Sequence, residues 1–393
     1  MDLDAFEWLL TEPGQALLAR AAEVRTEGDL RANDLLRREA SSERVAVALT
    51  QVALREKAGA KFGDLATRMY FTPDGLEQAT RLSVARHRAA RLNAFVTQSL
   101  IDLGCSIGGD LIASAEQGIT VAGVDLDPVR VAVARANLQA LGLSGAVAVA
   151  DATTVDTSPF AVAFADPGRR GARGRVFNAD GYSPPWSFVE SLLARTSCVK
   201  TAPGIPHDLI PEGVEAEWVS DHGEVKEAAL WSGGLATVRR RATVLGSGGL
   251  ATLTEEDDPV SPGSTNEGLV REVGSFLYEP DGAVIRAGLV TAVAAGVSGG
   301  LIDPQIAYVT SDDSFRTPFA RGYRVVEELP YREKQLKAAL RERGIGRLTI
   351  KKRGVDVVPE TLRQRLQPSG PEEGTIVLTR VRGAGTCLLV EPF

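Results

Sequence analysis

Cysteine and histidine are scarce in this 393-residue chain, which contains three of each. The cysteines, Cys105, Cys198 and Cys387, lie far apart, so their spacing predicts neither a disulfide framework nor a metal-binding motif. The three histidines are equally scattered. The sequence therefore gives no support to a metal site.

Long apolar runs and a basic N-terminal segment are also missing. The longest apolar stretch, residues 287–302, is too short to span a bilayer, and we interpret it as a buried helix. The first ten residues carry acids where a secretory signal peptide has basic residues. We therefore expect a cytoplasmic protein with no membrane attachment. Its hydrophobic fraction of 44% and charged fraction of 24% are those of an ordinary globular chain, long enough for two or three domains.

Glycines cluster where an apolar run ends, in residues 101–110 (IDLGCSIGGD). The helix-like segment LIASAEQG follows, so we expect a strand, a tight turn and a helix start. Glycine suits such a turn because it adopts backbone angles that a β-carbon forbids and lets a ligand approach the main chain. Amides at the helix start can then hold an anionic group. Many nucleotide-binding folds contain such a turn, so it does not decide between them.

Three further apolar runs follow, and each ends on an acidic residue. Residues 119–126 reach Asp125 and Leu126, residues 146–150 precede Asp151 and Ala152, and residues 160–165 precede Asp166 and Pro167. In an open α/β sheet the ligand crevice lies at the carboxyl ends of the strands. An acid at the tip of the second strand suits a ribose, because a carboxylate accepts hydrogen bonds from both hydroxyls.

This series resembles the motifs of class I S-adenosylmethionine (SAM)-dependent methyltransferases. The resemblance implies a Rossmann-like α/β sheet, with SAM as the cofactor. It implies that the methionine part is wrapped by Asp102, Gly104 and Gly108, the ribose bound by Asp125, and the adenine contacted by Leu126, Asp151 and Ala152. Ser106 stands where the family usually has its middle glycine, and we expect a slightly tighter pocket there. The G-x-G-x-x-G spacing is absent, which disfavours a NAD-dependent dehydrogenase.

Asp166 and Pro167 match the fourth motif of that family, beside the transferred methyl group. The resemblance implies that a side-chain oxygen and a backbone carbonyl align an attacking exocyclic amine here without acting as a base. The usual form is Asn/Asp-Pro-Pro-aromatic, in which the aromatic ring stacks on a flipped base. Gly168 and Arg169 replace the second proline and the aromatic. A simpler alternative for Asp166 is a turn or helix-capping residue.

The arginines that follow are candidates for holding a substrate. Arg169 and Arg170 could grip phosphates or stack on a base plane, and Trp186 offers a substitute stacking surface. The alternative is that these arginines form surface salt bridges with the acid-rich remainder of the chain.

Composition and periodicity divide the chain into four parts. Residues 1–75 place apolar residues at helical spacing, which predicts a helical domain that either packs against the sheet or shapes a substrate cleft. Residues 76–246 carry the methyltransferase motifs. Residues 247–271 are polar and rich in glycine, proline and acids, which predicts a linker or exposed loop. Residues 272–393 predict a separate α+β domain.

A predicted helix from about Gln78 enters the first strand of the methyltransferase part. It carries four arginines, at positions 81, 86, 88 and 91. Such a charge run is typical of a solvated helix face. Because a helix entering this strand lies over the cofactor, the alternative is that Gln78 and Thr80 contact the SAM carboxylate or the substrate.

Basic residues gather in residues 321–365, where 13 Lys/Arg face 6 Asp/Glu, a net charge of +7 in a chain of −7. The block includes Lys351, Lys352 and Arg353. It predicts either a phosphate-binding surface or a solvated face balanced by acids elsewhere. The arrangement of this part, with KKRG after a strand, resembles the THUMP-like domain of some bacterial methyltransferases, and THUMP domains are associated with RNA.

We therefore expect a SAM-dependent methyltransferase that modifies a base nitrogen in RNA. Two alternatives stay open: methylation of a protein or small molecule, and a non-catalytic scaffold that binds SAM or RNA.

Overall fold

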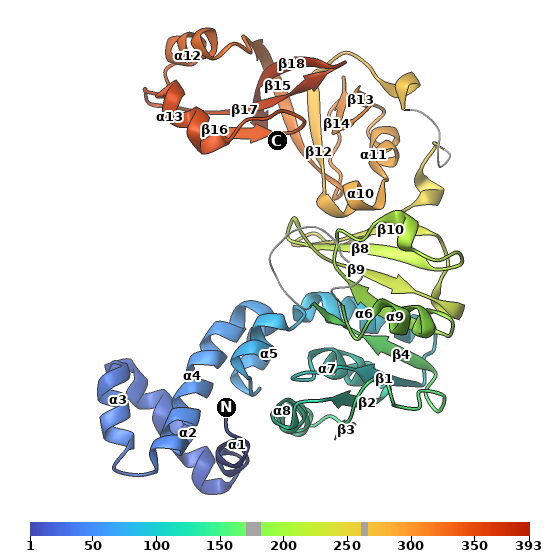
Figure 1. Ribbon diagram of the computed structural model, residues 1–393. Coiled ribbons are helices and arrows are strands. Elements are labelled where there is room, and N and C mark those ends of the chain that lie inside the picture. Colours follow the sequence, from blue (N-terminus) through green and yellow to red (C-terminus); the bar gives the residue numbers. More distant parts are fainter. Residues whose placement is uncertain (170–181, 261–265) are drawn as a thin grey trace. The chain divides into compact units, whose positions relative to one another are not determined.

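The computed structural model describes residues 1–169, 182–260 and 266–393. These residues form two compact units (Figure 1). Unit 1 comprises Met1–Glu215 and Ala228–Thr237, and unit 2 comprises Ala216–Glu227 and Val238–Phe393. The chain thus enters unit 2, returns to unit 1 and leaves it again. The four-part division predicted from composition remains a proposal.

Unit 1 begins with four helices: α1 (Leu3–Leu9), α2 (Glu12–Val24), α3 (Asp29–Leu36) and α4 (Ser42–Phe62). Asp2 and Thr11 cap the first two, because their side chains accept hydrogen bonds from backbone N–H groups in the first turn. Ser41 occupies the expected N-cap position of α4 in an extended conformation, but its side chain makes no capping hydrogen bond.

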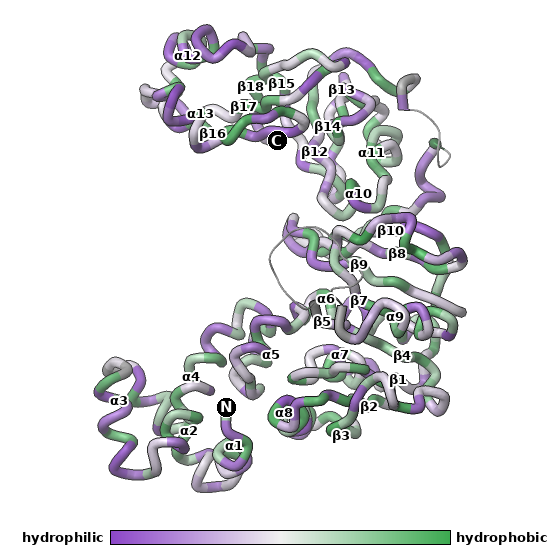
Figure 2. Tube along the Cα trace, viewed as in Figure 1, coloured by the Kyte–Doolittle hydropathy of each residue, from purple (hydrophilic) through white to green (hydrophobic). Residues whose placement is uncertain are grey.

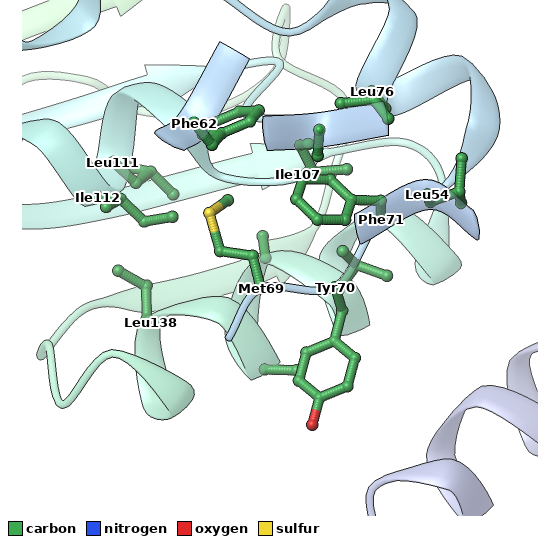
Figure 3. Packing of buried hydrophobic residues seen from close by; sticks show 14 of the residues in the cluster. Leu54, Phe62, Met69, Tyr70, Phe71, Leu76, Ile107, Leu111, Ile112 and Leu138 are labelled. Atoms are coloured by element: carbon green, nitrogen blue, oxygen red, sulfur yellow. The ribbon is translucent and has the colours of Figure 1, made fainter. Parts of the chain in front are cut away.

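These helices and the sheet of unit 1 share one hydrophobic core. Figure 3 shows Phe62 and Phe71 beside Ile107, with Met69 directed towards Leu111 and Ile112. All six are at most 1% exposed. The helical part therefore packs directly on the segment that contains the glycine turn.

Parallel strands alternate with helices in the rest of unit 1. The strands run in the order β9-β7-β4-β1-β2-β3. Their bounds are β1 (Ser99–Leu103), β2 (Thr120–Asp125), β3 (Ala146–Val149), β4 (Val162–Ala165), β7 (Ser197–Thr201) and β9 (Glu224–Trp231), the last shared with unit 2. The helices are α5 (Pro73–Gln78), α6 (Leu82–Ala94), α7 (Gly109–Glu116), α8 (Pro128–Ala140) and α9 (Trp186–Leu193). Only β9 runs antiparallel to its neighbour β7 among these pairs. The short strands β5 (Gly168–Arg169) and β6 (Tyr182–Ser183) pair with each other in a separate antiparallel ribbon.

Unit 2 contains β8 (from Glu215 to Asp221), β10 (Arg240–Gly246) and β11 (Gly249–Thr254), in the order β11-β10-β8. The strand β11 corrects the prediction that residues 247–271 form only a linker. The chain reverses direction over residues 247 and 248, and Gly249, which begins β11, has a φ of +102° that favours glycine. Leu250 and Leu253 then pair antiparallel with Leu245 and Ala242.

A second sheet makes up the rest of unit 2. Its seven strands run in the order β13-β14-β12-β15-β18-β17-β16. Their bounds are β12 (Phe276–Pro280), β13 (Gly300–Asp303), β14 (Ile306–Ser311), β15 (Ala320–Leu329), β16 (Ile345–Lys352), β17 (Glu372–Val381) and β18 (Ala384–Pro392). Two helices, α12 (Glu333–Glu342) and α13 (Pro359–Leu366), pack on this sheet through Leu336, Leu340, Leu362 and Leu366. Much of α12 and α13 is nevertheless hydrophilic (Figure 2).

The single buried helix predicted over residues 287–302 is wrong. The structure has α10 (Gly282–Ala287), α11 (Val290–Gly296) and then β13. Gly288 ends α10 in the left-handed region, with φ at +69°. A β-carbon on Gly299 would lie 2.2 Å from the Thr310 carbonyl oxygen. The end of this segment therefore pairs closely with β14 as a strand and does not continue the helix that its apolar residues suggest.

Candidate active site

The strands β1, β2 and β4 end side by side, because Leu103 is in register with Val124 on one side and with Ala165 on the other. A cavity of about 640 Å³ lies at this edge. Ten of the predicted cofactor and catalytic residues line it: Gln78, Thr80, Asp102, Gly104, Ser106, Asp125, Leu126, Asp151, Ala152 and Asp166. The two others, Gly108 and Pro167, are buried and do not line it.

The glycine turn uses three residues with positive φ: Gly104 at +105°, Ser106 at +48° and Gly108 at +83°. Gly108 is the left-handed N-cap of α7, and a β-carbon there would lie 3.2 Å from that of Ala134. Ser106 holds an angle that favours glycine, and its buried hydroxyl has no hydrogen-bond partner. The departure from the family pattern therefore carries a local conformational cost.

Asp125 is tied to the turn by its own carboxylate. One oxygen accepts a hydrogen bond from the Ser106 N–H at 3.0 Å, and the other accepts from the Asp127 N–H at 2.9 Å. The next side chain, Leu126, is 70% exposed and lines the cavity. Asp127 caps α8 by accepting from the Val129 N–H at 2.8 Å, as the Asp-Pro sequence predicts.

Asp151 also lines the cavity and is solvent-exposed. Its carboxylate accepts hydrogen bonds from the side chain of Thr153 at 2.7 Å and from its N–H at 2.9 Å, and these bonds lower the pKa of Asp151. The residue therefore offers a fixed, ionised acceptor at the cavity rim.

Asp102 is the deepest acid of the cavity, and its Oδ1 atom has no hydrogen-bond partner. Burial raises the pKa of Asp102 well above its usual value, and the negative charges of Asp110 and Asp166 raise it further. Arg88 opposes this effect. Burial and the neighbouring acids thus disfavour the ionised form of Asp102, whereas a nearby positive charge favours it.

Two of the arginines of α6, Arg88 and Arg91, do not lie on the solvated face that is one of our two expectations for this helix, whereas Arg86 is exposed. Arg88 is 3% exposed, pairs with Asp110 and lies over the Phe164 ring, 4.6 Å from its centroid. Arg91 pairs with the buried Glu215 at 2.7 Å. The sequence did contain a signal: positions 85, 88, 89 and 92 fall on one helical face, and three of them are Ala or Leu.

Two lysines at this site were not found from the sequence. Lys200, on β7, donates to Asp166 Oδ2 and, at 3.2 Å, to Thr80 Oγ1. Lys61, on α4, donates to the carbonyl oxygens of residues 76, 77 and 79 at 2.7–2.8 Å. These contacts hold Thr80 and Asp166 at the cavity wall. No sequence motif indicates them, because the partners are 15 to 120 residues apart.

Of the predicted substrate-binding residues in unit 1, only Trp186 has a described side chain. Arg170 lies outside the described residues, and only the backbone of Arg169, in β5, is described. Trp186 starts α9 and does not line the cavity, whereas Pro184 and Pro185 do.

The predicted basic cluster lies in unit 2 and consists of Lys351 and Lys352, at the end of β16, and Arg353, which follows it. Lys351 pairs with Glu279 at 2.6 Å, and Arg353 lies 3.9 Å from the same carboxylate. Lys352 is exposed. Pairing with Glu279 reduces the positive charge that this cluster can offer to a phosphate.

Comparison with known proteins identifies the family. A family model described as "THUMP domain-like" matches residues 320–392, and one described as "Domain of unknown function (DUF8688)" matches residues 2–58. An uncharacterized S-adenosylmethionine-dependent methyltransferase of Mycobacterium tuberculosis, present in two strains, is 39% identical over 345 residues, which cover 85% of this chain and 92% of the relative. The chain belongs to the SAM-dependent methyltransferases.

The fold of this methyltransferase is also found in a solved structure. A Porphyromonas gingivalis protein described as a presumed methyltransferase superposes with a TM-score of 0.75 at 22% identity, covering 96% of this chain and 98% of that chain. The predicted fold class, a class I methyltransferase sheet with a THUMP-like C-terminal domain, is therefore confirmed, as is SAM as the cofactor.

The described part of the methyltransferase contains no helix long and apolar enough to cross a bilayer. Within the same residues, no three histidine, cysteine or acidic side chains gather in a way that could hold a metal ion.

Proposed function

We propose that the cavity of unit 1 holds SAM as the family motifs imply. Its volume, about 640 Å³, suits a ligand of this size. The unpartnered Asp102 Oδ1 would accept a hydrogen bond from the ammonium of the methionine part. A β-carbon on Gly104 would meet no atom within 4 Å, so there is open space above the turn for the cofactor.

The nucleoside part would lie towards β2. Both oxygens of Asp125 already accept backbone hydrogen bonds, and their remaining lone pairs are available to the ribose hydroxyls. The exposed Leu126 side chain would pack on the adenine, with Asp151 and Ala152 at its edge. Gln78 and Thr80 would lie over the methionine part. When bound, SAM supplies an activated methyl group.

We propose further that Asp166 orients the methyl acceptor and that the acceptor is a base nitrogen in RNA. The observation that carries the RNA assignment is the THUMP-like match over residues 320–392, which coincides with the basic part of the chain. Asp166 faces the cavity, where its free oxygen can accept a hydrogen bond from an attacking N–H. This function would place the protein in the cytoplasm.

The docking surface for RNA in this proposal centres on α12. Arg332, Lys334 and Arg341 are exposed, as is Lys352 on β16, and none of the four forms a salt bridge with an acid that the structure describes. Lys334 and Arg341 are seven residues apart, so they lie on one face of the helix. This surface offers cations that are not already neutralised by neighbouring acids.

The first experiment measures the transfer of labelled methyl groups from SAM to total bacterial RNA and, separately, to protein extract. We expect label in RNA, reduced by roughly 100-fold in Asp166→Ala because the acceptor is no longer aligned. Calorimetric binding of SAM by the variant serves as the control for folding. Label in protein extract alone would overturn the RNA assignment and leave a protein methyltransferase.

The second experiment tests the docking surface by RNA binding at several salt concentrations. The double variant Lys334→Glu/Arg341→Glu should bind RNA more weakly and with a salt dependence smaller by about one to two ion equivalents. Its matched control, Arg20→Glu/Arg38→Glu, makes the same change in net charge at two exposed positions near the N-terminus, one on α2 and one in the turn after α3. Equal weakening in the two variants would show that only total charge matters and would remove α12 from the proposal.

A further inference from the structure

The side chains of Asp166 and Thr80 reach the cavity from separate segments, and Lys200 joins them. Lys200 lies on β7, directly beside β4, with Val199 in register with Ala165. Its ammonium donates to Asp166 Oδ2 and to Thr80 Oγ1. We propose that Lys200 is a positioning residue that fixes the Asp166 carboxylate for methyl transfer. This inference rests on the proposed role of Asp166 as the group that orients the acceptor.

The contact determines what Asp166 can offer to a substrate. A carboxylate has two oxygens and rotates readily about its side-chain bonds. Because Lys200 holds Oδ2, the Oδ1 atom is left for the acceptor, in one orientation. A methyl transfer in line with the leaving sulfur needs this kind of fixed geometry.

The same contact also supplies charge where acids are crowded. The charge of Asp166 contributes to the raised pKa of Asp102, and Asp110 and Asp125 act on Asp102 in the same direction. Arg88 opposes this effect on Asp102 and is itself paired with Asp110. Lys200 therefore supplies a positive charge at the Asp166 end of the acidic cluster.

A second lysine strengthens the arrangement. The segment that carries Thr80 is held by Lys61, whose ammonium donates to the carbonyl oxygens of residues 76, 77 and 79 just before it. Burial lowers the pKa of Lys61, and the positive charges of Lys200 and Arg81 lower it further. Thr80 is itself only 9% exposed. The Lys200 ammonium thus contacts both Asp166, just after β4, and Thr80, in a segment that Lys61 of α4 holds in place.

A purely stabilising ion pair would behave differently from a positioning residue. The side chains of Lys200 and Asp166 are 16% and 34% exposed, and a pair this accessible to solvent contributes little to folding. The proposal therefore predicts a small effect on stability and a large effect on turnover. A structural role predicts a loss of stability and of SAM binding together.

The test compares Lys200→Met, Lys200→Arg and wild type in the labelled methyl-transfer assay. We expect Lys200→Met to lower kcat by roughly 100-fold, with an unchanged KM for SAM and unchanged SAM affinity by calorimetry. Lys200→Arg, which keeps the charge and the donors, should recover at least a tenth of the lost activity. Lys226→Met is the matched control, because Lys226 pairs with Glu224 on β9 and does not line the cavity, so its loss should leave kcat unchanged.

Equal losses of SAM affinity and kcat in Lys200→Met, or full activity in that variant, would overturn the proposal. The comparison is made on whichever acceptor the wild type labels, so a failure of the RNA assignment does not affect it. If neither RNA nor protein extract takes label, the readout is a double-mutant cycle of Lys200→Met and Asp166→Asn in thermal unfolding. Additive shifts of the melting temperature in that cycle would likewise overturn the proposal.

Discussion

Breaking the buried pair between Arg88 and Asp110 should destabilise unit 1 strongly. The two side chains are 4% and 15% exposed. Removing one partner of such a pair costs about 3–5 kcal/mol, because the other charge stays buried without compensation. Arg88 also lies over the Phe164 ring, and losing this contact adds roughly 1 kcal/mol. We therefore expect Arg88→Leu to lower the free energy of unfolding by about 4–6 kcal/mol.

The assay is urea unfolding followed by tryptophan fluorescence, with the transitions of the two units fitted separately. Trp231 is buried in unit 1 and reports on it. Arg86→Leu is the control, because Arg86 lies on the same helix but its pair with Glu116 is 48% exposed on the arginine side, so its loss should cost at most about 1 kcal/mol. The double variant Arg88→Leu/Asp110→Leu should regain most of the loss, since neither charge of the pair is then left buried without its partner. Equal, small losses in Arg88→Leu and Arg86→Leu would refute the reasoning.

Three further predictions concern the sheet of unit 1. Because the pKa of Asp102 is raised in the folded state, the free energy of unfolding should fall as pH rises above about 4 towards that pKa, and Asp102→Asn should reduce this fall in urea titrations between about pH 4 and 8. Ser106→Gly should raise the free energy of unfolding by about 1 kcal/mol, measured by urea unfolding, because glycine accepts the positive φ without strain. Gly123→Ala should lower it by about 1–3 kcal/mol in thermal unfolding, because the new β-carbon would lie 2.7 Å from Leu111 Cδ1 and 2.9 Å from Cys105 Cβ; an unchanged melting temperature would contradict this.

The acids of the cavity could be placed near one another from the sequence. Asp102, Asp125 and Asp166 lie in or after apolar runs, and the carboxyl ends of parallel strands meet at one edge of a sheet. The positions of the acids at the ends of the predicted strands therefore place them near one another. The structure also has a hairpin between β17 and β18, with positive φ at Arg382 and Gly383, and the glycines at positions 383 and 385 are a sequence signal for such a turn.

The lysines that hold these acids could not be found in this way. Lys61 and Lys200 act through contacts between segments far apart in the chain, which leave no local pattern. The strand β11 was missed because its flanking glycines and acids are equally typical of a loop, and only pairing with β10 makes it a strand. In residues 287–302, an apolar run suited both a helix and a strand, and close packing against β14 decided the outcome.

The return of the chain to unit 1 has a consequence for its synthesis. The edge of β7 is covered by β9, through pairs such as Val199 with Leu230, and all four residues from 228 to 231 are buried. These residues emerge from the ribosome only after residues 216–227, which belong to unit 2. Until then β7 presents an open sheet edge with unpaired backbone groups, the kind of edge that promotes aggregation. A fragment that ends at residue 215 would keep this open edge permanently, and one that starts at residue 238 would lack part of unit 2, so no single cut separates the two units intact.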